Sequence, residues 1–342
     1  MKNIFKSILI GICLTGFQCK PHPPHFDLNP YADWSLNDPG LQRSSLSFPL
    51  APTWDARVRT LDKVHTQTLV SLNKIDGYEE IPEKSDKEEL FAAKLALIHK
   101  SLPEKVSVLM DRYLYGIYFV KNLGTTGVTG IIRYNKEPIG GIVFLDTDFL
   151  NRTANDWATF KEKSVFTEPE GKQIRVILEK EENNTDVAAL EFILLHEFGH
   201  ILATVESHAP DYSETKRDYR NLPFFKGIWI GESVSEFDED DFTERKKIKF
   251  YGKEKINLIP EGLNLYKKLH DLPFVTLYAA TNADDSYAEA FVSYVHMVLQ
   301  GRPYEVQLTE PNAKSIIFRN GILRDEGEQS RKFFDKILNT KE

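Results

Sequence analysis

The stretch DVAALEFILLHEFGHILATV, residues 186–205, constrains the fold of this chain more than any other part of its sequence. It is mostly apolar, contains no proline and starts at a capping residue, Thr185 or Asp186, so it predicts one long helix. On such a helix His196 and His200 lie on the same face, about one turn apart. The helix therefore presents two imidazoles side by side.

The pattern HExxH within this helix is typical of a zinc site. Two neutral imidazoles can bind the ion, and Glu197 beside them can take a proton from a metal-bound water. Only nine histidines occur in the 342 residues, so chance seldom gives this pattern. We therefore expect His196 and His200 to bind Zn²⁺ and Glu197 to act as general base. The competing interpretation is a core helix whose histidines have only structural partners.

Helical patterns also occur on either side of this stretch. Residues 85–102 have apolar side chains at helical spacing behind a capping residue, Ser85 or Asp86. A second helix is expected after Pro103. Far downstream, a helix with an apolar stripe is expected to begin near Asn282.

Strand patterns lie between these helices. Aromatic and β-branched residues crowd together at 117–120, and residues 172–183 also read as a strand. Residues 129–150 read as strands interrupted by turn residues, which are Asn135, Lys136 and Pro138. Helices, a few strands and then a long helix predict an α+β fold with a small mixed sheet.

The overall charge argues against nucleic acid as a partner. The chain has ample material for a packed core, with 41% hydrophobic residues, and its formal net charge is −8. It contains no cluster of Lys and Arg with interleaved aromatic residues. Contacts to phosphates need a basic surface, so we expect no nucleic-acid binding.

The first residues are typical of an exported bacterial protein. Lys2 and Lys6 precede an apolar stretch that is too short to span a bilayer, and LTGFQC resembles a lipobox ending at Cys19. We expect a signal peptide at residues 1–18 and a lipid anchor at Cys19, which would make the protein a membrane-anchored lipoprotein of the cell envelope. Plain cleavage with secretion, or an uncleaved anchor, is the alternative.

Proline, aspartate and asparagine dominate the next segment, so we expect residues 19–55 to form an extended tether. His22 and His25 in this segment read as part of a solvated linker and not as a metal site. One monomeric domain is then expected at residues 56–342. It contains a charged insertion at about 206–275.

Within that insertion, residues 232–244 are acidic and residues 245–255 are basic. We expect a solvated surface, such as a charged hairpin; a recognition loop for a particular substrate is the alternative. The remaining histidines have no identifiable partner, and these are His65, His99, His270 and His296.

A catalytic zinc site needs a third protein ligand and one open position. Glu206 stands where an extended HExxHxxGxxH motif has its last ligand, but Ala203 replaces the glycine that turns the chain there. His208 is expected at the surface. Asp285 and Glu289 lie one turn apart on a mainly apolar helix, where one can bind zinc while the other accepts the free N–H of a ligand histidine.

HEFGH, Tyr278, the pair TN at 281–282 and the run YAEAF at 287–291 together resemble the gluzincin metallopeptidases, the family that includes the catalytic domain of anthrax lethal factor. The resemblance covers two motifs within residues 185–296. It implies a zincin-like metallopeptidase domain, with one helix carrying HExxH and a second helix carrying the third ligand.

Carried over to this chain, the resemblance makes Asp285 the third zinc ligand and Glu289 the partner of a ligand histidine. It implies that Tyr278 stabilises the oxyanion of the reaction. The family usually has glutamate where this chain has Asp285, and the segment between the two motifs is longer here. Glu289, Glu206 and Asp284 therefore stay open as alternative ligands.

The implied activity is that of a zinc-dependent endopeptidase acting on a peptide or protein substrate. Glu197 would take a proton from the metal-bound water and pass it to the leaving amine. Related enzymes hold the substrate along the edge strand of a small sheet, and residues 140–146 are the candidate for that strand. The alternative function is a cell-envelope lipoprotein that acts in binding or adhesion and has a non-catalytic zinc site.

Overall fold

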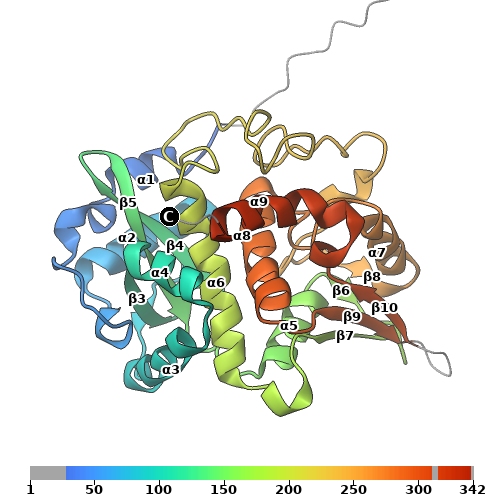
Figure 1. The fold of residues 1–342 in the computed structure, drawn as a ribbon, viewed down its shortest axis with the longest axis horizontal. Helices are drawn as coiled ribbons and strands as arrows, with labels where there is room; N and C mark the ends of the chain where they lie inside the picture. The colour runs from blue at the N-terminus through green and yellow to red at the C-terminus, as the bar shows by residue number, and fades with distance from the viewer. Residues whose placement is uncertain (1–27, 310–314, 340–342) are drawn as a thin grey trace, which may run out of the picture.

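The computed structural model describes residues 28–309 and 315–339. The signal peptide expected at 1–18, the lipid anchor at Cys19, and His22 and His25 lie outside the described residues. The helices are α1 (Ala32–Asn37), α2 (Lys63–Asp76), α3 (Glu88–Ser101), α4 (Glu104–Tyr113), α5 (Ala154–Lys163), α6 (Asp186–Val205), α7 (Leu263–His270), α8 (Ala283–Ser293) and α9 (Glu328–Asn339). The strands are β1 (Val58–Arg59), β2 (Glu83–Lys84), β3 (Leu114–Lys121), β4 (Gly127–Tyr134), β5 (Glu137–Asp146), β6 (Phe166–Thr167), β7 (Gln173–Ile177), β8 (Ile256–Asn257), β9 (Glu305–Thr309) and β10 (Ile316–Arg319). Helices around small sheets make a mixed α/β structure, compatible with the expected α+β class (Figure 1).

The largest sheet is built around the parallel pair β3 and β5. Its order is β1-β3-β5-β4, and β2 pairs antiparallel with β3. β4 and β5 form an antiparallel hairpin whose turn residues Asn135 and Lys136 have φ of 53° and 72°, as a tight two-residue turn requires. Pro138, expected in the turn, instead pairs with Arg133 inside the hairpin.

Strand β4 lies at one edge of this sheet, and β1 lies at the other. The expectation that residues 140–146 form the edge is therefore wrong, because β5 lies between β3 and β4. Every residue from 140 to 146 is buried. A continuous apolar run of this kind is typical of a strand covered on both faces and paired on both edges.

Helix α6 packs between this sheet and α8 (Figure 1). A Cβ on Gly141 of β5 would lie 2.5 Å from Cγ1 of Ile201, so the glycine lets the helix lie directly on the sheet. Among the described helices, α6 alone has the length and apolar composition to cross a membrane, but 89% of its apolar window is buried inside the protein. It is therefore the central helix of the core.

Smaller sheets complete the other half of the molecule. β7 pairs with β9, and β9 with β10, all antiparallel, while β6 pairs in parallel with β8. Helix α5 packs against both β7 and α6. This half thus shares its core with the large sheet through α5, α6 and α8.

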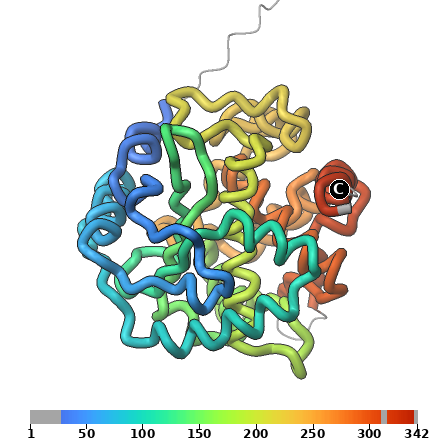
Figure 2. Tube along the Cα trace, turned by 60° about the vertical axis from the view of Figure 1, so that its left-hand side comes forward, coloured from blue at the N-terminus to red at the C-terminus, as the bar shows by residue number. Residues whose placement is uncertain are grey.

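The described part of the N-terminal segment packs on the domain. The expected extended tether is therefore wrong for residues 28–55. This segment lies beside the β4–β5 hairpin (Figure 2). Leu41 is fully buried and Trp54 is 2% exposed. Isolated apolar residues in a proline-rich run have no period, so their burial could not be detected from the sequence.

Most charged side chains of the acidic and basic halves are exposed, which agrees with the expected solvated surface, but the segment is not a hairpin. Residues 232–255 form turns and a short 3₁₀ helix. Arg245 and Asp238 are buried and form an ion pair of 2.7 Å. Nη1 of Arg245 also donates to the carbonyl oxygens of Ala280 and Thr281, each at 2.9 Å. The opposite charges of the two halves therefore hold the chain just before α8.

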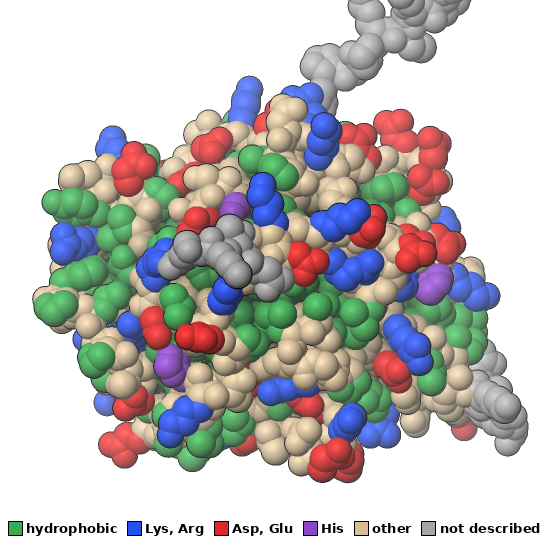
Figure 3. All heavy atoms as spheres, in the orientation of Figure 1, with side chains coloured by type: hydrophobic (Ala, Val, Ile, Leu, Met, Phe, Trp, Pro, Cys, Tyr) green, Lys and Arg blue, Asp and Glu red, His purple; other side chains and the backbone are tan. Residues whose placement is uncertain are grey.

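The surface carries both signs of charge. On the face drawn in Figure 3, acidic and basic side chains are interspersed with apolar ones, and no side-chain type forms one large area. The exposed large apolar residues, such as Ile81 and Ile317, are scattered over different elements. This face therefore has no continuous basic area of the kind that holds a phosphate backbone.

The predicted helices are confirmed after Pro103, at Thr185 and at Asn282. The side chains of Thr185 and Asn282 cap α6 and α8 by accepting a backbone N–H. Helix α3 begins later than predicted, at Glu88, because Ser85 accepts the backbone N–H of Lys87 in a turn that precedes the helix.

His296 is a structural residue of the core, with partners that could not be identified from the sequence. It is 2% exposed, and its Nε2 lies 2.8 Å from the carbonyl oxygen of Leu178 and 3.0 Å from that of Pro303. A neutral ring protonated at Nε2 donates to these oxygens. Burial lowers the pKa of His296 to about 4.

Because of His296, the free energy of unfolding should decrease as pH falls from about 6.5, the ordinary pKa of a histidine, toward 4. Within this window the unfolded chain binds a proton that the folded chain excludes, so the free energy of unfolding rises with pH. His296→Gln should flatten that slope. His270→Gln, at an exposed histidine, is the control. Thermal unfolding at a series of pH values measures the slope, and equal slopes for wild type and His296→Gln would contradict the prediction.

Candidate metal centre

Helices α6 and α8 approach each other closely where Gly199 faces Ala288. A Cβ on Gly199 would lie 2.8 Å from the Cα of Ala288, so a side chain does not fit there. Near this contact, α6 carries His196 and His200, and α8 carries Asp285. The close approach therefore brings residues that can bind a metal together from two helices.

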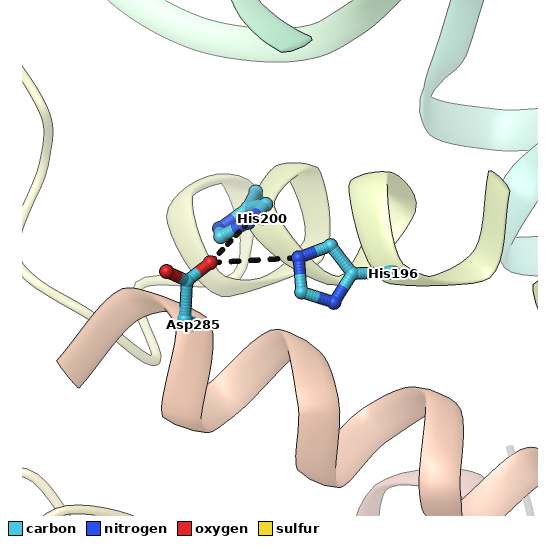
Figure 4. Close-up of side chains that lie close together, drawn as sticks. All are labelled: His196, His200 and Asp285. Carbon is cyan, nitrogen blue, oxygen red and sulfur yellow. Dashed lines mark ion pairs between the residues drawn. The ribbon is translucent and has the colours of Figure 1, made fainter. Parts of the chain in front are cut away.

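The side chains of His196, His200 and Asp285 point toward one another (Figure 4). Oδ1 of Asp285 lies 3.5 Å from Nε2 of each histidine, and one ligand atom from each residue lies within 4.8 Å of the others. Two ligands about 2.1 Å from one ion at tetrahedral angles are roughly 3.4 Å apart. The spacing of the three side chains thus fits one zinc ion.

Glu289 lies behind His196, outside the cluster of possible ligands. It is fully buried, and its Oε1 lies 3.1 Å from Nδ1 of His196. This contact is close but lacks the alignment of a hydrogen bond, so it is an ion-pair contact. Nζ of Lys161 donates to Oε1 at 2.7 Å, and Oγ1 of Thr276 donates to Oε2 at 2.8 Å. Glu289 is thus positioned to orient a ligand histidine.

For Asp285, Glu289 and His196, nearby opposite charges change the pKa more than burial does. Burial raises the pKa of Asp285, but its contacts with His196 and His200 hold that pKa well below its usual range. Burial also acts against ionisation of Glu289, yet Lys161 and His196 lower its pKa to about 2. Burial lowers the pKa of His196, whereas Asp285 and Glu289 raise it to about 9. Both carboxylates are therefore ionised and can balance the charge of a divalent cation.

Glu197 is fixed between α6 and the edge strand β4. It is 7% exposed, and Oγ1 of Thr129 lies 2.7 Å from its Oε2 and 3.0 Å from its backbone oxygen. A Cβ on Gly127 would lie 2.5 Å from Oε1 of Glu197, so the carboxylate occupies the space above this glycine. Glu197 lines the same cavity as His196.

Tyr278 lies next to His196 in that cavity, with ring centroids 5.7 Å apart. Nζ of Lys161 lies 4.0 Å from the centre of the Tyr278 ring, and the ring of Phe250 packs against it at an interplanar angle of 75°. Burial, followed by the charge of Asp285, raises the pKa of Tyr278 well above its ordinary value. Its hydroxyl therefore keeps its proton at neutral pH and can donate a hydrogen bond.

The other candidate ligands have different partners. Asp284 forms an ion pair with Arg217. Glu206 is exposed beyond the end of α6 and accepts a hydrogen bond from Tyr113. His208, expected at the surface, is half-buried and hydrogen-bonded to a tyrosine of α8. Neither Asp284 nor Glu206 belongs to the cluster around His196.

Sequence reasoning missed residues that complete the site from other elements. These are Lys161 of α5, Thr129 and Gly127 of β4, and Tyr212, whose hydroxyl lies 3.2 Å from Nδ1 of His200. Of these residues, Lys161 alone could have been detected from the sequence. It continues the buried positions Ala154, Trp157 and Ala158 at helical spacing, and a lysine on such a stripe requires a buried anionic partner.

A cavity of about 220 Å³ lies in front of these groups. Its lining contains the candidate ligands together with Glu197 and Tyr278. The N-terminal segment and α2 also line it, with Tyr31, Trp34, Leu72 and Asp76. Strand β4 contributes residues 127–129 and Ile131.

No family model, curated protein or solved structure matches this chain. The resemblance to gluzincins therefore rests on the residues of the two motifs. The convergence of His196, His200 and Asp285 does not depend on that resemblance.

Replacing Gly199 with alanine should destabilise the protein and weaken zinc binding. Helix propensity alone favours alanine by about 1 kcal/mol, whereas overpacking against the α8 backbone costs about 1–3 kcal/mol, so the net effect should be unfavourable. Denaturant unfolding measures the first quantity and zinc titration the second. A Gly199→Ala variant that is more stable than wild type would contradict the tight contact.

Asp285→Asn should lower zinc affinity, because it removes the one carboxylate among the three candidate ligands. The loss should exceed the roughly 10–100-fold that follows when only a residue supporting a ligand is replaced. Glu206→Gln, an equivalent change at an exposed acid, should leave affinity unchanged. Metal content after dialysis, followed by titration, makes the comparison. Similar losses in both variants would remove Asp285 from the ligand set.

Proposed function

We propose that the protein is a zinc-dependent peptidase with a zincin-like catalytic domain. The observation that carries this proposal is the convergence of His196, His200 and Asp285 beside the buried carboxylate of Glu197, at the wall of a cavity. A purely structural zinc site has no use for such a carboxylate. A catalytic site needs it at this position.

The residue types in the cluster suit zinc. Two imidazole nitrogens and one carboxylate oxygen are a common catalytic ligand set, and they leave one coordination position for solvent or substrate. Glu289 supplies the carboxylate that fixes a ligand histidine and strengthens it as a base. Lys161 neutralises Glu289, so the fully buried acid is not left as an isolated charge.

A zinc ion bound there would lower the pKa of its water to about 7 and polarise the substrate carbonyl. Glu197 would take the proton of that water, and Thr129 holds the carboxylate in place for this. The same carboxyl group would then give the proton to the leaving amine. The deprotonated water would attack the carbonyl carbon, and the peptide C–N bond would break as the amine takes this proton.

Tyr278 is proposed to donate its hydroxyl hydrogen to the oxyanion that forms at the attacked carbonyl. Its raised pKa keeps that hydrogen in place, and its ring is held between Phe250 and Lys161. A donor fixed before the reaction is effective because it needs no reorganisation as charge develops.

The substrate is proposed to bind in extended form at the free edge of β4. This strand, and not the predicted 140–146, runs past Glu197. Backbone hydrogen bonds to a strand edge bind peptides with little dependence on their sequence. Export and lipidation at Cys19 complete the proposal, which places the activity at the cell envelope.

Glu197→Gln should abolish peptide cleavage while zinc content stays unchanged. Loss of a general base lowers kcat by about 10²–10⁴-fold. The test compares wild type, Glu197→Gln and Glu206→Gln on a mixture of unstructured peptides, with zinc measured in each sample. Cleavage that persists in zinc-loaded Glu197→Gln would remove its assigned role. Zinc-loaded wild type that cleaves nothing would favour the alternative of an envelope binding protein.

A further inference from the structure

The free edge of β4 is only partly accessible. β5 pairs with one edge of β4, and on the other edge Gln42 forms a bridge to Arg133. Leu41 packs on the face of the sheet at Gly130, where a Cβ would be 2.6 Å from Cδ2 of Leu41. Gln42 therefore covers the edge at Arg133. Before that bridge, residues 127–129 and Ile131 line the cavity, and 127–129 lie beside Glu197.

The covering segment is firmly attached to the domain. Arg133 is 1% exposed and donates from Nε to the backbone oxygen of Ser35 at 2.7 Å and from Nη2 to Oγ of Ser35 at 2.9 Å. Trp34 donates from Nε1 to the carbonyl oxygen of Thr68 in α2 at 3.1 Å. Removing the segment would leave a buried arginine without these partners, so residues 35–42 are a permanent wall of the cleft.

The residues just before this segment contact the loop next to the candidate metal centre. The side-chain amide of Asn29 donates to the backbone oxygen of Tyr212 at 2.8 Å, and the hydroxyl of Tyr212 contacts Nδ1 of His200. The N-terminal segment thus supports the loop beside a candidate ligand. It belongs to the architecture of the site.

We propose that the cleft is closed at this end and that the enzyme removes one to three residues from the free amino terminus of peptides. Residues 130–132 separate Thr129, which contacts Glu197, from the bridge at Arg133. Three residues of strand, at about 3.3 Å each, can pair with roughly three residues of substrate. The cavity of about 220 Å³ is smaller than the roughly 300–1,000 Å³ of drug-sized sites, so it suits a chain end.

The charge of the cavity lining selects the amino terminus over the carboxyl terminus. Asp76, at the end of α2, lines the cavity, and the hydroxyl of Tyr31 donates to its Oδ1 at 2.6 Å. None of the described residues that line this cavity is a lysine or arginine. An ammonium group would meet a carboxylate there, whereas a terminal carboxylate would meet no cation. Trp34 and Leu72 offer apolar contact to the first side chains of the substrate.

This inference rests on the proposed peptidase function, narrows the expected endopeptidase to an exopeptidase, and can fail separately. The test uses zinc-loaded full-length protein and one series of peptides, each made with a free and with an acetylated amino terminus. Products are identified by mass spectrometry. We expect cuts within three residues of the amino terminus, and at least about tenfold lower kcat/KM after acetylation, as loss of a charge-assisted contact implies.

Asp76→Asn keeps the shape of the side chain and removes its charge. It should raise KM for free peptides, leave acetylated peptides unaffected, and so reduce the ratio between the two kcat/KM values. Asp33→Asn makes the same change at an exposed position of α1, where the carboxylate accepts a hydrogen bond from Asn37. This control should keep the wild-type ratio.

Cuts at interior bonds of acetylated peptides, at rates equal to those of free peptides, would overturn the closed cleft while leaving the peptidase proposal intact. An unchanged ratio in Asp76→Asn would overturn the role of that carboxylate. No cleavage in either series by zinc-loaded protein would overturn the proposed function itself.

Discussion

The contact between Gly199 and Ala288 is the constraint on which the candidate metal centre depends. Imidazole and carboxylate side chains are short, so two helices can share one ion only if their backbones approach closely. The absence of a side chain at Gly199 permits this approach. Asp285 is shorter than the glutamate usual in gluzincins, and it therefore needs the helices nearer together. Gly199 inside HEFGH and Ala288 inside YAEAF act as a pair, although neither is a candidate ligand.

Charge balance follows from the same packing. Bringing α8 against α6 buries Glu289 completely, and an unpaired carboxylate at that depth would be strongly unfavourable. Lys161 from α5 supplies the opposite charge and is itself buried. The helices α5, α6 and α8 must therefore be packed together before Lys161 and Glu289 form their buried ion pair. The supporting layer of the site is thus also part of the core. Substitutions at Lys161 are expected to affect stability and metal affinity together, since the same contact serves both.

The motif residues could be predicted from the sequence because each depends on local periodicity. A helix with HExxH puts His196 and His200 on one face whatever surrounds it, and the resemblance identified Asp285 and Glu289 on a second helix. Strand order could not be predicted in this way. Residues 140–146 have the composition of a substrate-binding edge, yet pairing with β3 puts them inside the sheet. Contacts such as Thr129 with Glu197, or Asp238 with Arg245, join side chains whose proximity arises only after the chain has folded.

The N-terminal segment shows most clearly how tertiary context changes the meaning of a sequence. Its prolines and lack of period are typical of a linker, but Gln42 bridges Arg133 at a strand edge that would otherwise be free to pair with another chain. Covering that edge protects the protein from unwanted pairing and also limits how far a substrate can extend along β4. The uncovered part of the edge begins next to Glu197, at 127–129, and ends before Arg133. One segment thus accounts for both the protected sheet edge and the short binding cleft, because both depend on which backbone groups of β4 stay open.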